Sequence, residues 1–282
     1  MGFGSVLQFN EGWQARLEVG LERREQRTVL AHRRHWGPLR LQKPFYPEDE
    51  SVCHLILLHP PGGVVAGDGL QIEVHLKEKS HGLITTPGAG KWYGSTGAVA
   101  RQQVTLHLET GAILEWLPQE NTVYDGARVD WGLAVHLAPG ATFVGMDMLC
   151  LGRQASGERF LQGKLVFANR IWDQHHPLWW EQGVVEGGAP CLAAPSGWAG
   201  YGISGHLVVA GPEVENDWRD LCRACTPPAS VWGGVTALPR VLIVRGLSQE
   251  SEALRHWLRQ IWLELRPLVT GQPAQWPRIW NT

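Results

Sequence analysis

Six carboxylates between residues 68 and 158 are the side chains of this sequence with the most evident capacity for chemistry. They are Asp68, Glu115, Glu120, Asp125, Asp147 and Glu158. If the turns that carry them share one side of a stacked β structure, these carboxylates line a polar groove. Taken singly, each is more typical of a solvated turn. The sequence contains no recognisable arrangement of a nucleophile with its base, so the carboxylates alone do not indicate an enzyme.

Two short motifs resemble functional sites but lack the residues that would complete them. The stretch 88–91 (GAGK) fails as a phosphate-binding loop, because Thr85 stands where that pattern needs glycine and Trp92 follows the lysine. Cys222 and Cys225 have the spacing of half a zinc site or of a redox pair, yet there is no second pair. On a helix this spacing places both thiols on one face, which predicts packing in the core.

Three histidines recur at matching positions of an internal repeat. His75, His107 and His136 lie 32 and then 29 residues apart, each between two apolar residues, and a turn and a second apolar run follow each of them. A period near 30 residues with strand–turn–strand content predicts stacked β units, each covering the open face of its neighbour. We expect these histidines to be packed or to face solvent rather than to bind a metal.

Composition excludes several classes of function. Charged residues make up 18% of the chain and the net charge is −2, so the basic footprint of a nucleic-acid-binding protein is missing. There is no apolar run long enough for a membrane span and no secretion signal, and the five cysteines are scattered. We therefore expect a cytoplasmic protein with reduced thiols, bound neither to nucleic acid nor to a membrane.

The elements that must position these side chains are mainly strands. Alternating apolar residues predict a strand over 13–21, and a buried strand over 51–58 leads into a Pro/Gly-rich loop at 59–70. Helical periodicity appears at about 213–225 and 248–265, where Pro267 ends the second helix. The predicted fold is mainly β, with stacked sheets of β-helix-like character and two α-helices in the C-terminal third. We expect one domain over 1–282, β-rich from 13 to 210.

Six stretches, in order along the chain, closely resemble the urease accessory protein family UreD, also called UreH. They are residues 59–70 (HPPGGVVAGDGL), 85–95 (TTPGAGKWYGS), 114–120 (LEWLPQE), 151–158 (LGRQASGE), 265–267 (LRP) and 277–282 (PRIWNT). The motifs span most of the chain and are jointly very specific. Gly94 departs from the family, which usually has arginine there, so any anionic contact of that arginine is missing.

The resemblance implies a maturation factor with no catalytic activity of its own. Members of the family bind the helical accessory protein UreF, which carries the GTPase UreG, and dock on apo-urease. The expected partners are therefore UreF, UreG through UreF, and the urease subunits, in a dimeric assembly with UreF and UreG. Nickel delivered by the GTPase is thought to pass through UreD to the urease active site. We expect no permanently bound cofactor, only transient Ni²⁺.

Two groups of residues follow from this resemblance as candidate sites. Oxygen ligands hold Ni²⁺ less tightly than a histidine and cysteine cage does, and a conduit must release its cargo. The carboxylates expected along the nickel path are Asp68, Glu120, Asp147 and Glu158. The side chains expected to bind the UreF-like partner, on the helices and the tail, are Trp257, Trp262, Ile279 and Trp280.

Two other functions remain open on the residues alone. A β-helical carbohydrate-active enzyme, such as a polysaccharide lyase or hydrolase, would use groove carboxylates. A generic β-rich interaction scaffold would need none of them. The absence of a secretion signal disfavours the carbohydrate-active enzyme.

Overall fold

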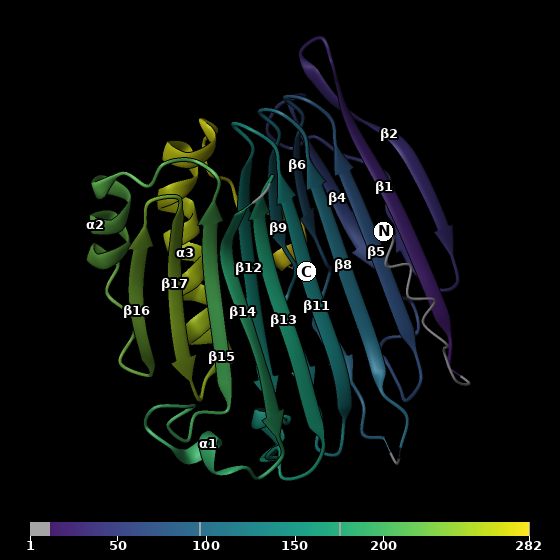
Figure 1. Ribbon diagram of the computed structural model, residues 1–282, viewed down its shortest axis with the longest axis vertical. Coiled ribbons are helices and arrows are strands. Elements are labelled where there is room, and N and C mark those ends of the chain that lie inside the picture. The colour runs from purple at the N-terminus through teal and green to yellow at the C-terminus, as the bar shows by residue number, and fades with distance from the viewer. Residues whose placement is uncertain (1–11, 96, 175, 282) are drawn as a thin grey trace.

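Two stacked β-sheets form the body of the molecule in the computed structural model, which describes residues 12–95, 97–174 and 176–281 (Figure 1). In the seven-stranded sheet the order is β14 (His176–Glu186), β13 (Lys164–Asp173), β11 (Arg128–Leu137), β8 (Ala100–Leu108), β5 (Gly69–Leu76), β1 (Gln14–Arg24) and β2 (Arg27–Trp36). In the ten-stranded sheet it is β16 (Val231–Leu238), β17 (Val241–Ser248), β15 (Ile203–Ala210), β12 (Thr142–Leu151), β9 (Ile113–Leu117), β6 (His81–Thr85), β4 (Val52–Leu58) and β3 (Arg40–Leu41). Two further strands, β10 (Asn121–Val123) and β7 (Gly90–Trp92), extend the second sheet beside β12.

The internal repeat corresponds to coils that pass from one sheet to the other. In each copy the histidine-containing run is a strand of the seven-stranded sheet, and the following apolar run is a strand of the ten-stranded sheet. Strands β5, β8 and β11 are parallel to one another, as are β6, β9 and β12. The predicted stacked, β-helix-like arrangement is therefore confirmed.

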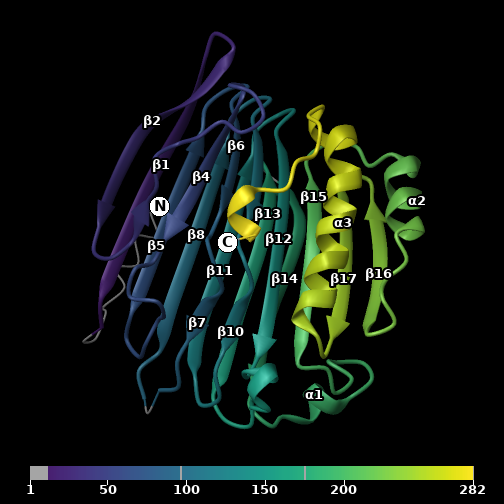
Figure 2. The same ribbon diagram turned by 180° about the vertical axis from the view of Figure 1, so that it is seen from behind.

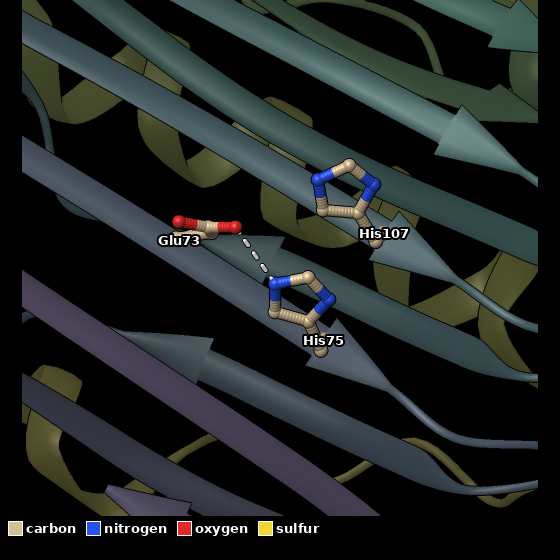
Figure 3. Close-up of side chains that lie close together, drawn as sticks. All are labelled: Glu73, His75 and His107. Atoms are coloured by element: carbon tan, nitrogen blue, oxygen red, sulfur yellow. Dashed lines mark hydrogen bonds and ion pairs between the residues drawn. The ribbon is translucent and has the colours of Figure 1, made fainter. Parts of the chain in front are cut away.

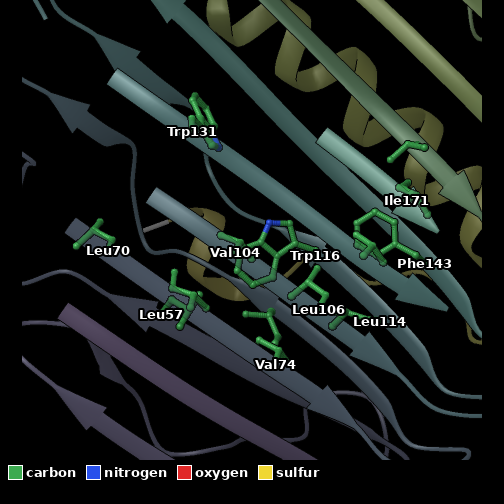
Figure 4. Packing of buried hydrophobic residues seen from close by; sticks show 14 of the residues in the cluster. Leu57, Leu70, Val74, Val104, Leu106, Leu114, Trp116, Trp131, Phe143 and Ile171 are labelled. Carbon is green, nitrogen blue, oxygen red and sulfur yellow. The ribbon is translucent and has the colours of Figure 1, made fainter. Parts of the chain in front are cut away.

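Alternation along the strands creates the core between the sheets. Val74 and Leu106 point inward from the seven-stranded sheet, and Leu114 and Phe143 point inward from the ten-stranded sheet (Figure 4). Leu17 on β1 belongs to the same core. All five side chains are fully buried. Because side chains alternate between the two faces of a strand, the residues between these positions point away from the core.

Among the described residues, helices cover only one of the two outer faces. Figure 2 shows α3 (Ser251–Thr270) lying along the ten-stranded sheet, with α2 (Asn216–Ala224) beside it. A second core between this sheet and the helices contains Leu254, Leu258 and Ile261. Short helical turns lie at α1 (Pro190–Ala193), η1 (Gln154–Ser156) and η2 (Arg278–Asn281). Within the described ranges, no helix combines the length and the apolarity that crossing a bilayer requires.

Both predicted helices are present, but the second extends further than expected. Pro267 lies inside α3, which continues to Thr270. Two contacts hold this last turn: the Thr270 hydroxyl donates to the carbonyl of Arg266 at 2.8 Å, and the backbone N–H of Gly271 donates to the carbonyl of Pro267 at 3.1 Å. The prediction that Pro267 ends the helix was therefore wrong.

Candidate functional site

The loops that carry the sequence motifs meet at one cavity of about 380 Å³ between the two sheets. Its wall includes residues 62–64 after β4, 86–92 after β6 and 118–119 after β9. Val104 and Trp131 close it from the seven-stranded sheet, and Phe143 closes it from the ten-stranded sheet. The Pro/Gly-rich loop is thus part of the wall of an interior space, and not only a surface connection.

Two glycines in these loops are required because other groups approach them closely. A Cβ on Gly63 would lie 2.1 Å from Cε2 of Tyr93, and a Cβ on Gly90 would lie 2.3 Å from Oδ1 of Asn121. The same Asn121 oxygen accepts a hydrogen bond from the indole of Trp92 at 3.1 Å. A side chain at Gly90 would therefore displace an amide that is fixed in the cavity wall.

Asp147 and His206 lie where this cavity adjoins a second one of about 500 Å³. The two residues are register partners on the antiparallel strands β12 and β15, so both side chains point between the sheets. Trp131 and Asn169 also line both cavities. The amide nitrogen of Asn121 donates a hydrogen bond to Oδ1 of Asp147 at 3.4 Å. The two cavities, whose walls are mostly apolar, thus meet at a polar junction, and together they form a passage that leads from the motif loops past Asp147.

Burial shifts the protonation of the two groups at this junction in opposite directions. It raises the pKa of Asp147 to about 7, although hydrogen bonds from Asn121 and from the Met148 backbone act the other way. It lowers the pKa of His206 to about 4, although the negative charge of Glu181 opposes that shift. Near neutral pH the imidazole is uncharged, and Asp147 divides between its acid and carboxylate forms. Neutral imidazole and carboxylate are the forms that bind divalent transition metals.

The second cavity contains a charged pair and lies beside the surface. Glu181 and Arg245 line it and form an ion pair at 3.3 Å. Trp232 also belongs to its wall and is 55% exposed. The passage therefore has one polar junction inside the protein and an ion pair nearer to solvent.

The four carboxylates expected along the nickel path do not gather in this passage. Among them, Asp147 alone lines either of the two cavities. Asp68 is buried before β5, where its carboxylate accepts hydrogen bonds from the backbone N–H groups of Trp13 at 2.8 Å and Val65 at 3.0 Å. These bonds fix the turn of the 59–70 loop, which is a structural task for Asp68.

Glu120 and Glu158 are engaged in ion pairs. Both carboxylate oxygens of Glu120 lie 2.7 Å from Nη1 of Arg255 on α3. Glu158 binds the guanidinium of Arg153 at 2.9 Å and also accepts a hydrogen bond from its backbone N–H at 2.9 Å. These pairs connect neighbouring segments of the chain, and a role of Glu120 or Glu158 with nickel remains a prediction.

Gly94 lies where the chain has no room for a longer residue. A Cβ there would lie 2.8 Å from the carbonyl oxygen of Asp125. The loop must therefore shift before any side chain, including the arginine usual in the family, can occupy this position.

A buried ionic network, not predicted from the sequence, joins α3 to the ten-stranded sheet. Arg266 contacts Glu115 at 2.9 Å and Glu48 at 2.8 Å. His81 contacts Glu115 at 2.9 Å, and His54 contacts Glu48 at 2.8 Å. All five side chains are at most 6% exposed. Only the positions of Glu115 and Arg266 in two family motifs gave any signal of this network.

The network keeps Glu115 ionised inside the protein. Burial on its own would raise the pKa of Glu115, but the hydrogen bond from His81 and the charge of Arg266 outweigh it and hold the pKa at about 2. The indole of Trp262 donates a further hydrogen bond to Oε2 of Glu115 at 2.9 Å. A carboxylate with this many donors is stabilised in its charged form.

The side chains expected to bind a partner lie at different depths. Trp257 and Trp262 are buried in the core under α3, so in this arrangement they offer no surface to a partner. Trp280 is partly buried against Trp262, with ring centroids 5.6 Å apart, and its indole donates to the Thr85 hydroxyl at 2.8 Å. Ile279 is half-buried beside it. The tail thus docks on α3 and β6, and partner binding by these residues remains a prediction.

The two incomplete motifs have structural roles. Gly90 begins strand β7, whereas a phosphate-binding loop would open a helix there. Cys222 is buried on α2, and burial raises the pKa of its thiol to about 12, so it is not a thiolate near neutral pH. Cys225 packs against the same core. The predicted packing role of this cysteine pair is confirmed.

Comparison with known proteins agrees with these motifs. Residues 14–281 match the family described as UreD urease accessory protein. The chain belongs to the UreD family. It is 46% identical over 281 residues to the urease accessory protein UreD of Dechloromonas aromatica, covering 99% of this chain and 98% of that protein. It is 45% identical over 271 residues to the UreD of Azoarcus sp. (strain BH72), covering 96% and 95%.

Membership in the UreD family supports an accessory role connected with urease. The UreD of Pseudomonas aeruginosa, 42% identical over 277 residues and covering 98% of each chain, also bears the name urease accessory protein. The family is thus named for an accessory role in connection with urease and not for an enzyme activity. The carbohydrate-active enzyme is therefore disfavoured.

Proposed function

We propose that this UreD-family chain is a non-catalytic urease maturation factor that joins a UreF–UreG complex to apo-urease and lets nickel pass between its two sheets. The observation that carries the proposal is the polar junction at Asp147 and His206, where the two cavities meet. The loops with the UreD motifs form the wall at one end of the passage. An internal route keeps the ion inside protein during transfer.

The chemistry of the junction suits a passing ion. One carboxylate, one neutral imidazole and the amides of Asn121 and Asn169 offer oxygen and nitrogen ligands without a cysteine. Such a set binds Ni²⁺ more weakly than a cage of thiolates and several imidazoles. Because proton release from Asp147 accompanies metal binding, transfer should slow as the pH falls below about 7.

The test measures nickel per urease active site after activation with purified partners. We expect Asp147→Asn to assemble normally with UreF, UreG and apo-urease but to load urease at least several-fold more slowly. The matched control is Asp130→Asn, since Asp130 lies on β11 and its carboxylate is 41% exposed. Normal loading by an assembled Asp147→Asn variant would reject the passage.

The same assay addresses the other three carboxylates and the lack of catalysis. Asp68, Glu120 and Glu158 are engaged in hydrogen bonds or ion pairs, so variants that assemble but load urease normally would show that these contacts are structural and would remove the predicted nickel role. GTP hydrolysis by the isolated chain above the buffer background would contradict the non-catalytic assignment.

A further inference from the structure

Three stacked histidines form a row on the open face of the seven-stranded sheet. His75 pairs in register with His107, and His107 pairs with His136, on the parallel strands β5, β8 and β11. Their ring centroids are 4.6 Å and 4.9 Å apart, and the ring planes differ by only 13° and 10°. The spacing is that of adjacent strands, because each ring stands on the same position of its repeat.

A carboxylate from the neighbouring position completes a cluster with two of these histidines. Glu73 precedes His75 by two residues on β5, so both side chains point to the same face (Figure 3). Its Oε1 lies 2.9 Å from Nε2 of His75. One ligand atom from each of Glu73, His75 and His107 can be chosen so that all three lie within 4.8 Å of one another.

The cluster is open to solvent. The side chain of His75 is 49% exposed and that of Glu73 is 28% exposed. On the next strand the residue opposite His75 is Gly20, which has no side chain to cover the imidazole. Arg16 contacts Oε2 of Glu73 at 3.4 Å, which leaves Oε1 on the side of His75.

We propose that Glu73, His75 and His107 bind a divalent transition-metal ion, such as Ni²⁺ or Zn²⁺, on the outer face of the seven-stranded sheet. Imidazole nitrogen with carboxylate oxygen suits both ions. The ion takes the place of the proton between Glu73 and His75, and water fills the remaining positions. Since metal–nitrogen bonds are about 2.0–2.1 Å long, the two rings must tilt out of their parallel stack to converge. Both are surface side chains and can do so.

This site is distinct from the proposed nickel passage. Asp147 and His206 point between the sheets, whereas the side chains of this cluster alternate with the inward-facing Val74 and Leu106 and so point outward. Binding here therefore does not depend on the proposed function. From the sequence we expected these histidines to be packed or solvent-facing rather than to bind a metal, and the proposed site departs from that expectation. They do face solvent, and it is their register that brings them beside Glu73.

The experiment titrates the metal-free full chain with NiCl₂ and ZnCl₂ at neutral pH by calorimetry. We expect His75→Gln/His107→Gln to lose one bound equivalent or to weaken its Kd at least tenfold, and Glu73→Gln to weaken it less. The matched control is His35→Gln. His35 is exposed on β2 of the same sheet, but it pairs with the inward-facing Leu17 and so lies on the opposite face.

Two further measurements keep the proposal falsifiable. Asp147→Asn removes the carboxylate of the passage and should leave the equivalent at the histidine row intact. In the unmodified chain, paramagnetic Ni²⁺ should broaden the ring NMR signals of His75 and His107 before those of His256, which lies on α3. Wild-type stoichiometry and affinity in the double variant would overturn the proposal, as would broadening that spares His75 and His107.

Discussion

The outer faces of the two sheets differ in how they hold ionisable side chains. On the ten-stranded sheet, Glu115 is buried beneath α3 against Arg266 of that helix, and each charge has several partners. On the seven-stranded sheet, Glu73 and His75 lie in the open with a single hydrogen bond between them. The same residue types therefore stabilise the fold on one face and remain free to bind an ion on the other.

Burial accounts for this difference. A buried ion pair is desolvated, so removal of one partner leaves an uncompensated charge in a medium of low polarity. An exposed pair exchanges its partner for water at little cost. Paired substitutions on the two faces can therefore test the comparison directly.

The largest effect is expected for Arg266→Met. It leaves Glu48 and Glu115 buried without their shared cation, which should lower the free energy of unfolding by about 3–5 kcal/mol. Arg16→Met on the open face should cost at most about 1 kcal/mol, because Arg16 is half exposed. Urea denaturation of the two variants measures both values. Equal losses would mean that burial does not distinguish the faces.

The next-largest effect is expected from acid, which should lower the stability that the buried Glu115 gives to the face covered by α3. The folded-state pKa of Glu115 is about 2, below its ordinary value of 4.5, so its stabilisation is fully present above pH 4.5 and is lost as the pH falls toward 2. Urea midpoints measured between pH 6 and pH 3 should fall less steeply in Glu115→Gln than in the wild type. Glu109→Gln, which alters an exposed pair with Lys77, should keep the wild-type slope. Parallel curves for all three proteins would contradict the assignment.

A smaller loss is expected at the tail. Trp280→Ala removes the hydrogen bond to Thr85 and the packing on Trp262, at a cost of about 2 kcal/mol. Trp36→Ala should change stability little, because Trp36 is 64% exposed. Binding of the UreF-like partner by soluble Trp280→Ala then shows whether the tail also contributes to an interface. An unchanged unfolding midpoint would show that the docked tail adds nothing to stability.

The smallest effect is expected on the open face. In the absence of metal, His75→Gln/His107→Gln should change the free energy of unfolding by less than about 0.5 kcal/mol, since His75 is exposed and His107 is half-buried on the uncovered outer face. A loss comparable to that of Arg266→Met would show that the stacked row is structural.

Local periodicity made much of the fold predictable. The alternation at 13–21 appears as β1, and the three repeat segments with His75, His107 and His136 appear as β5, β8 and β11. Each of these strands was predicted from residues close together in sequence. The end of α3 was predicted wrongly because the prediction used only the local tendency of proline to terminate a helix. The bonds of Arg266, the residue before Pro267, are made with distant parts of the chain and stabilise this end of the helix.

The site was less predictable because its contacts join distant segments. Arg266 lies 151 residues from Glu115 and 218 residues from Glu48. His206 reaches Asp147 only through the pairing of β12 with β15. Asp147 was identified through its place near the UreD motifs, whereas nothing in the residues around His206, Asn169 or Glu181 marked them as part of a passage.

The late position of Arg266 also affects synthesis of the chain. A ribosome that adds 5–20 residues per second needs roughly 10 to 40 s to travel from Glu48 to Arg266. Until Arg266 is added, Glu48 in the loop before β4 and Glu115 on β9 lack the guanidinium that later pairs with both, and the apolar surface that α3 will cover is exposed. Completion of this side of the molecule must therefore follow translation of α3, and until then the exposed apolar surface makes the growing chain prone to aggregation.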